Sequence, residues 1–483
     1  MFLKRVPHLF LAALSGLILS IGGVSSLAAD KVFKAAAVKV DISQELGVSL
    51  NGGMQDRTAT EIHDPLHARC LVLNDGKNSL AFVINDSCMI PREVFDTAKL
   101  IASEKTGIPT SNMMMSATHT HTAPTSADVF QSDSNGNYKH FLIEKIAEAI
   151  VTAHKNLRPA RIGWGKGSEP DHVFNRRWHL DPEITLKNPF GREELVRMNP
   201  SPGDKSLIKP AGPIDPLVHV VSVVSTNGTP IGVLANYSLH YVGGTLGGHV
   251  SADYYGVFAR KLASIIGADT GGEKGFVAMM SNGTSGDINN INFYRPRVRK
   301  QPYEQIELVG DVVAAEAYKV WRQIEYNDWV PLGALEQEIT LATRKPDEAD
   351  IQYAKDVLER HAVKKIPRLA TREEIYAGET MDMTLYPPLV DLKLQAFRIG
   401  DLSVAAIPCE TFVEIGLELR LNSPFKDHFT ISLANGYNGY LPTRKHHELG
   451  GYETWRAKSS YLGVDSAHKV VATLTDLMDK LNR

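Results

Sequence analysis

The sequence predicts an α/β protein with a mixed β-sheet core surrounded by helices. From Val38 onward, short β-branched runs alternate with amphipathic helical stretches, and this alternation is typical of α/β folds. With 43% hydrophobic and 22% charged residues in 483, the chain can bury a large core. No repeat, low-complexity tract or long Gly/Ser linker divides the sequence, so we expect a single domain over residues 30–483.

The expected strands are short runs of β-branched and apolar residues, and the expected helices carry apolar residues at three- and four-residue spacings. The strand candidates are 38–42, 70–73, 80–84, 112–115, 218–222, 231–235, 276–280, 392–397 and 402–407. The helix candidates are 94–105, 138–155, 254–266, 306–321, 412–421 and 468–481. The charge-rich stretch 344–380 predicts a helical excursion on the surface.

Residues 1–28 have the pattern of a secretory signal peptide. Lys4 and Arg5 precede an apolar run, and small residues end at Ala28. The run is short for a membrane span, so an uncleaved anchor helix is the less favoured alternative. We therefore expect an exported protein, either periplasmic or secreted.

Charge and cysteine content exclude two other classes of protein. The formal net charge of −3, with no long run of Lys or Arg, argues against a nucleic-acid binder. Cys70, Cys88 and Cys409 are too few, and odd in number, for a disulfide framework. One bridge is possible, but core packing is the expected role of each thiol.

Two histidines two positions apart, His119 and His121, follow the apolar run 112–115. If that run is a strand reaching the break at Pro124, its two-residue period places both side chains on one face. An HxH pair alone is a weak metal signal, because imidazole also serves as an ordinary hydrogen-bonding group. His240, at the end of the strand predicted from 231, would alone be a structural histidine, but its strand-end position resembles that of His119.

Further polar candidates also stand at predicted strand ends or in loops. Glu410 follows the strand 402–407 and is either a ligand or the cap of the helix 412–421. Tyr440 and Tyr452 lie in glycine-rich loops, where a substrate-facing role is more natural than a core role. Arg176 either presents its guanidinium to an anionic or carbonyl oxygen or forms a surface ion pair. The loop that contains Asn289 is rich in small hydrogen-bonding residues, as a plain turn would also be.

The order of these segments resembles the catalytic domain of the neutral (non-lysosomal) ceramidases. The resemblance extends from about Val38 to Tyr461, and its most specific parts are Thr118-His-Thr-His121 and two tyrosines twelve residues apart. It implies a neutral-ceramidase-like domain and a zinc amidase with Zn²⁺ as cofactor. The implied zinc ligands are His119, His240, Glu410 and Tyr440.

The same resemblance implies the catalytic residues. His121 would hydrogen-bond the substrate or move a proton, and Arg176 and Tyr452 would bind the carbonyl oxygen as it becomes negative. Asn289 falls where the family has a serine needed for activity, and asparagine can hold a water or donate to an oxyanion but cannot be a nucleophile. The implied substrate is an N-acyl lipid such as ceramide, cleaved to a sphingoid base and a fatty acid.

Two departures from the family pattern keep alternatives open. Besides Asn289, the chain ends at Arg483 without the immunoglobulin-like C-terminal domain of full-length ceramidases, which we expect to alter lipid presentation or contact with a membrane surface. The alternatives are a zinc hydrolase for another small acylated substrate, such as an ester, lactone or sugar-linked amide, and a non-catalytic zinc-containing binding protein. An amidohydrolase barrel also uses HxH but requires an eightfold repeat that this sequence lacks.

Overall fold

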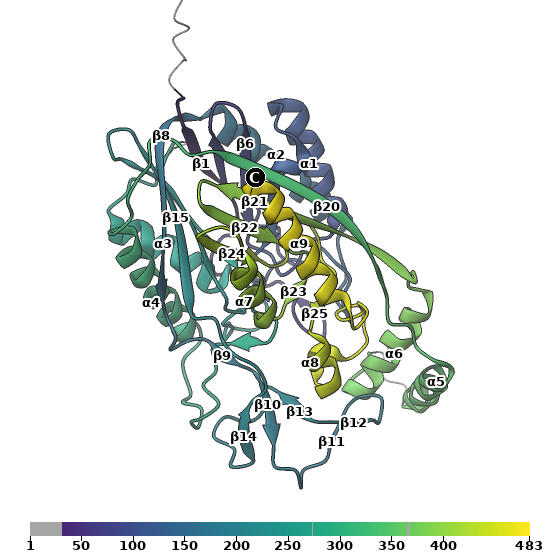
Figure 1. Ribbon diagram of the computed structural model, residues 1–483. Helices are drawn as coiled ribbons and strands as arrows, with labels where there is room; N and C mark the ends of the chain where they lie inside the picture. Colours follow the sequence, from purple (N-terminus) through teal and green to yellow (C-terminus); the bar gives the residue numbers. More distant parts are fainter. Residues whose placement is uncertain (1–30, 273, 365–367) are drawn as a thin grey trace, which may run out of the picture. The chain divides into compact units, whose positions relative to one another are not determined.

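Two mixed β-sheets form the centre of the protein (Figure 1). The computed structural model describes residues 31–272, 274–364 and 368–483, so the predicted signal peptide, 1–28, lies outside the described residues. Residues 32–483 cluster as one compact unit. Within the described ranges, no helix is both long and apolar enough to cross a bilayer.

The larger sheet has eight strands in the order β18-β16-β15-β8-β1-β5-β6-β7, and the smaller has four in the order β20-β21-β22-β24. The bounds in the larger sheet are β1 Lys34–Asp41, β5 His67–Asn74, β6 Ser79–Asn85, β7 Met113–Ala117, β8 Arg158–Ser168, β15 Leu217–Ser225, β16 Pro230–Tyr237 and β18 Val277–Asn282. Those in the smaller sheet are β20 Leu332–Ala342, β21 Leu389–Ile399, β22 Leu402–Ala406 and β24 Asp427–Ile431.

The helices are α1 Arg92–Thr106, α2 Gly136–Lys155, α3 Asp253–Ile266, α4 Glu304–Trp321, α5 Glu348–Val363, α6 Arg372–Leu385, α7 Val413–Asn422, α8 Arg444–Leu449 and α9 Ser466–Asn482, with short 3₁₀ turns η1 Thr110–Asn112 and η2 Tyr452–Thr454. The remaining strands are short: β2 Ser49–Leu50, β3 Arg57–Thr58, β4 Glu61–Ile62, β9 Phe174–Asn175, β10 Arg177–Leu180, β11 Leu186–Lys187, β12 Glu193–Glu194, β13 Val196–Met198, β14 Leu207–Pro210, β17 His249–Val250, β19 Ile288–Asn289, β23 Glu410–Thr411 and β25 Tyr440–Leu441.

The elements stack in four layers, because most strands of the two sheets are buried on both faces. On β5, Cys70 and Val72 face the core under α1 and α2, whereas Leu71 and Leu73 face the smaller sheet. The other end of the large sheet is covered by α3 and α4, and the outer face of the small sheet is covered by α7 and α9. Each fully buried aliphatic side chain contributes roughly 1.5–3 kcal/mol to such a core.

The structure confirms the predicted fold class and finds an element at each strand and helix candidate. The excursion 344–380 folds as α5 and α6, and all three cysteines are buried free thiols as expected. Strand β8 was not expected, because Gly163, Gly165 and Gly167 interrupt its apolar pattern. These glycines let α4 lie close: a Cβ on Gly167 would stand 2.3 Å from Oε1 of Glu316 on that helix.

The prediction that a strand carries both His119 and His121 is wrong. Strand β7 ends at Ala117, after which the backbone leaves the sheet and bonds to the loop beyond β6, with His119 N donating to Ser87 O at 2.8 Å. His119 itself takes a left-handed conformation with a φ of 77°, so a bend in the loop, rather than the strand period, aims its ring. A non-glycine residue in this region costs of order 1 kcal/mol or more, and such strain is concentrated at functional sites.

Candidate metal centre

Three buried side chains converge beyond the carboxyl ends of β7, β16 and β22. The Nε2 atom of His119 lies 3.1 Å from Nε2 of His240 and 3.1 Å from Oε2 of Glu410. The third edge, from His240 Nε2 to Glu410 Oε2, is 3.7 Å. All three residues are at most 5% exposed, so two imidazoles and a carboxylate meet in a site shielded from water.

The spacing of these atoms fits a tetrahedral cation. Zinc bonds nitrogen and oxygen at roughly 2.0–2.2 Å, which places neighbouring ligand atoms of a tetrahedron about 3.3 Å apart. The Nδ1 atom of His119 bonds to the carbonyl of Cys88 at 2.7 Å, and that of His240 bonds to the carbonyl of Ser285 at 3.1 Å. Because a carbonyl only accepts, each Nδ1 carries the proton and each Nε2 turns a lone pair towards the centre.

The electrostatics of the cluster also favour a positive charge between the three side chains. Oε2 of Glu410 has no hydrogen-bond donor among the described residues. Burial alone would lower the pKa of His119, but the carboxylate of Glu410 outweighs it and raises that pKa well above the ordinary value. A proton or a metal ion is therefore stabilised between these side chains.

Glu410 does not cap α7, since the N-cap residue of that helix is Phe412. It lies on β23, and its Oε1 accepts a hydrogen bond from the hydroxyl of Tyr437 at 3.0 Å. This bond fixes the carboxylate so that the other oxygen faces the two imidazoles. Of the two alternatives that the sequence left open, the structure therefore excludes the helix cap.

Tyr440 lies directly opposite Glu410 in the β23–β25 pair. Its hydroxyl accepts a hydrogen bond from Arg176 Nη2 at 3.1 Å, and the guanidinium stands 5.6 Å from the centre of its ring. Burial raises the pKa of Tyr440 well above its ordinary value, so the hydroxyl is neutral in the absence of a metal. The structure thus places this predicted ligand beside the cluster, and its bond to a metal stays a prediction.

Arg176 is held by a buried ion-pair network. Its Nε donates to Glu453 Oε1 at 2.8 Å, and Nη2 also donates to the carbonyl of Gly286 at 2.7 Å. Arg177 Nη1 donates to the other carboxylate oxygen of Glu453, Oε2, at 2.6 Å. The guanidinium of Arg176 therefore has a fixed position beside Tyr440, which is what the stabilisation of a developing negative charge requires.

His121 connects the cluster to a cavity of about 430 Å³. Its Nε2 lies 3.2 Å from Nε2 of His119, and its ring stacks on Tyr241, with centroids 3.6 Å apart and planes tilted by 17°. Both rings line the cavity together with Gly52. A Cβ on Gly52 would stand 2.4 Å from Cγ of His121, so only glycine lets the backbone approach the ring so closely.

A second group of ligand atoms includes a thiol: Cys88, His119 and His121 also converge. The sulfur of Cys88 lies 3.8 Å from Nδ1 of His119, the nitrogen whose proton already bonds to the Cys88 carbonyl. That nitrogen has no free lone pair for a metal, so the group with His240 and Glu410 is the better cation site.

The two remaining predicted catalytic residues differ in their surroundings. The ring of Tyr452 contacts that of Tyr440, with centroids 5.8 Å apart, on the side where Arg176 and Glu410 lie. Asn289 is buried with its amide occupied: Nδ2 donates to Asn199 Oδ1 at 2.5 Å, and Oδ1 accepts from the backbone of Ile291 at 2.8 Å. Its catalytic role stays a prediction, and these bonds give it a structural role in the loop.

Three residues around the cluster were not predicted as site residues. Tyr437 belongs to the glycine-rich loop that suggested Tyr440, and Tyr241 directly follows His240, so the sequence offered a signal for both. Glu453 follows Tyr452 in the same way, but its partners are Arg176 and Arg177, some 277 positions away. Such a pairing depends on the tertiary fold.

Two packed mixed sheets with a buried two-histidine, one-carboxylate group define this protein as a candidate metalloenzyme with an α/β fold. The family model "Neutral/alkaline non-lysosomal ceramidase, N-terminal" matches residues 40–297. Since the match covers more than half of the chain, the protein belongs to the neutral/alkaline non-lysosomal ceramidase family.

Distant relatives agree with this assignment. The chain is 26% identical over 190 residues to neutral ceramidase A of Dictyostelium discoideum, a match that spans 37% of this chain and 24% of that protein. It is 23% identical over 520 residues to the neutral ceramidase of Pseudomonas aeruginosa, across 92% of this chain and 72% of that one.

Two solved structures share the fold at 19% sequence identity. One, described as a ceramidase complexed with C2, has a TM-score of 0.70 over 94% of this chain and 76% of that chain. The other, the neutral ceramidase from Pseudomonas aeruginosa, has a TM-score of 0.69 over 94% and 75%.

Proposed function

We propose that the protein is an exported zinc-dependent amidohydrolase that cleaves the amide bond of an N-acyl lipid, with ceramide as the first substrate to test. The observation that carries the proposal is the buried group of His119, His240 and Glu410, which adjoins a cavity in a chain of this family. Export rests on the signal-peptide pattern of residues 1–28.

Zinc bound by these three residues and Tyr440 would supply a Lewis acid and a water molecule with a pKa of about 7. The chain's own residues would bind and orient the substrate around it. His121 stands between the cavity and the cluster, where it can hydrogen-bond the amide or move a proton to the leaving amine. Arg176 and Tyr452 lie on the Tyr440 side and would donate to the carbonyl oxygen as its charge grows.

The first experiment pairs metal analysis with turnover of a fluorescent short-chain ceramide. Wild-type protein, chelated protein and His240→Ala are compared, and His140→Ala, an exposed histidine on α2, serves as the matched control. We expect about one zinc per chain in the wild type and the control, little in His240→Ala, and turnover only where zinc is bound.

Full turnover by metal-free protein would overturn the metal mechanism. Bound zinc with no turnover of the ceramide would overturn the ceramide assignment and leave the metal site standing. In that case, a panel of esters, lactones and sugar-linked amides would identify the bond that is cleaved.

A further inference from the structure

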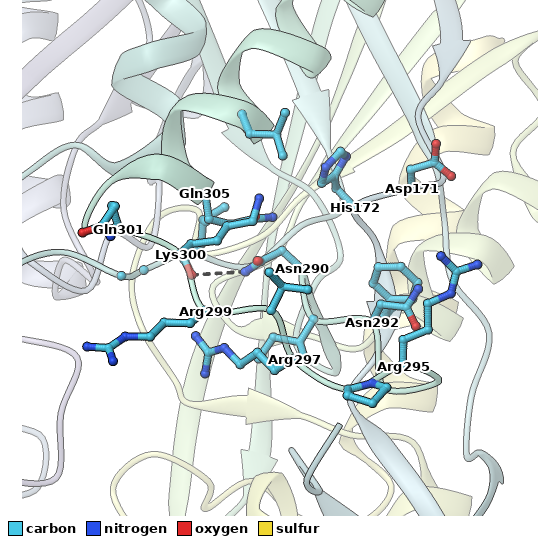
Figure 2. Close-up of a pocket in the computed structure, with 18 of the residues that line it drawn as sticks. Asp171, His172, Asn290, Asn292, Arg295, Arg297, Arg299, Lys300, Gln301 and Gln305 are labelled. Atoms are coloured by element: carbon cyan, nitrogen blue, oxygen red, sulfur yellow. Dashed lines mark hydrogen bonds between the residues drawn. The ribbon is translucent and has the colours of Figure 1, made fainter. Parts of the chain in front are cut away.

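A second cavity, of about 580 Å³, is lined by an unusually basic loop. Figure 2 shows the side chains drawn around it, among them those of Arg295, Arg297, Arg299 and Lys300. Four cations therefore occur within six consecutive residues of one wall. The cavity lies within the size range of small-molecule sites, roughly 300–1,000 Å³.

These four cations have no acidic partners in the part of the chain that the structure describes, whereas the cations of α3 and α4 are paired. On α3, for example, Lys261 bonds to Asp311 at 3.0 Å. Asp171 is the single carboxylate among the residues that line the cavity. Amide groups that can also donate to an anion complete the polar wall, namely Asn290, Asn292, Gln301 and Gln305.

The basic loop is anchored at both ends, so the cavity is a built feature. At one end, Phe293 is buried against Trp178, with ring centroids 5.9 Å apart, and Asn290 Nδ2 donates to Val242 O at 3.1 Å. At the other end, the backbone of Tyr303 donates to Gly244 O at 3.0 Å. The loop is thereby fastened to the segment that directly follows His240.

The basic cavity adjoins the cavity of the metal centre. Gly243 and Gly244 line both of them. Gly244 is four residues from His240, so the two Cα atoms are separated by no more than about 14 Å even in a fully extended chain. The two cavities are therefore close enough for a single elongated molecule to occupy both.

The adjoining cavity is lined by His121, which would serve the leaving amine, so we propose that the basic cavity binds an acidic group on the amine-side portion of the substrate. This inference rests on the proposed function, and it narrows the substrate class to N-acyl compounds that carry a carboxylate, sulfate or phosphate. Charged acceptors suit the guanidinium groups, which bind such oxygens through paired hydrogen bonds. The concave shape and small volume favour this occupant over the flat surface of an anionic membrane.

The test compares dodecanoyl amides of ω-amino acids of increasing length, from glycine through γ-aminobutyrate to ε-aminocaproate, with amides of the matching ω-amino alcohols. The series varies the distance between the amide and the acidic group while the acyl chain stays constant. We expect kcat/KM to favour the acid by about tenfold at the spacing that fits. The preference should shrink as salt rises, because the screening length falls to about 3 Å at 1 M.

The diagnostic variant replaces three arginines together, and its control removes the same number of exposed cations elsewhere. The variant is Arg295→Gln/Arg297→Gln/Arg299→Gln, and the control is Lys105→Gln/Lys155→Gln/Lys355→Gln. The acid preference should vanish in the variant and persist in the control, while kcat/KM for the amino-alcohol amides stays within about twofold. Equal turnover of acids and alcohols by the wild type, or a preference retained by the variant, would overturn the inference. If the preference for acid amides appeared only when the substrates were presented in anionic vesicles, the inference would be overturned in favour of docking of the basic loop on a membrane.

A binding measurement distinguishes failure of this inference from failure of the proposed function. Calorimetric titration of dodecanoyl-ε-aminocaproate is performed on chelator-treated protein, which the proposed mechanism makes inactive. If no amide is hydrolysed by the zinc-loaded enzyme but binding is lost in the arginine variant alone, the acid site stands and the amidase proposal fails. If amides are hydrolysed while binding is equal in wild type and variant, the proposed function stands and the acid site fails.

Discussion

Removing the hydroxyl of Tyr437 should weaken metal binding without touching any ligand. The hydroxyl donates to Glu410 Oε1 at 3.0 Å, where Glu410 is buried and Tyr437 is half-buried. A hydrogen bond to a charged group contributes about 1.5–3 kcal/mol. Since each 1.4 kcal/mol is about a factor of ten, we expect Tyr437→Phe to raise the Kd for zinc about 10- to 100-fold.

The assay is competition for zinc against a chromophoric chelator, with the melting temperature of the metal-free protein measured in parallel. Tyr326→Phe is the matched control, because it removes a hydroxyl that bonds at 2.9 Å to the neutral side chain of Ser222, outside the site. The control should bind zinc like the wild type. An unchanged Kd in Tyr437→Phe, with the metal-free fold intact, would refute the claim that this bond orients the carboxylate for a metal.

Three further predictions concern residues around the site and in the core. Glu453→Gln leaves Arg176 and Arg177 buried without their carboxylate, so the unfolding free energy should fall by about 3 kcal/mol in denaturant titrations; a loss below about 1 kcal/mol would contradict the network. Burial lowers the pKa of Lys99 from 10.5 to about 7, so between these values the unfolded chain binds more protons and stability rises with pH. Lys99→Met should remove that rise, and equal pH slopes in both proteins would exclude it. Asn289→Ala should lower the melting temperature but reduce turnover by less than about tenfold, since its amide is already bonded; a loss above about a hundredfold would restore a catalytic role.

The sequence predicted best those elements whose local pattern matches their burial. Strands such as β5 and β6 are buried on both faces and are apolar nearly throughout, so their continuous apolar runs are easily recognised in the sequence. Strand β8 could not be recognised because glycines interrupt its apolar pattern. Their role, which is to let α4 pack closely, is apparent only in the folded structure. Strand β20 reads as polar, because much of it is only half-buried.

Residue type and strand-end position were enough to select His119, His240 and Glu410, which the structure brings together. The means of their placement could not be read from the sequence. The left-handed backbone at His119 and the bond from Tyr437 to Glu410 arise from loops that meet only in the folded protein. The role of Glu453 is hidden for the same reason, since its two arginines are remote in sequence.

The three converging side chains come from different parts of the chain, and this limits how far the protein can be shortened. The family match ends at residue 297, after both histidines but before Glu410. A fragment cut at that boundary would keep the imidazoles, lose the carboxylate and lose the four-stranded sheet against which the larger sheet packs. Expression, sequence searches and laboratory evolution that treat residues 40–297 as the working unit would therefore act on an incomplete site, and variation beyond residue 400 should affect activity as strongly as variation in the HxH loop.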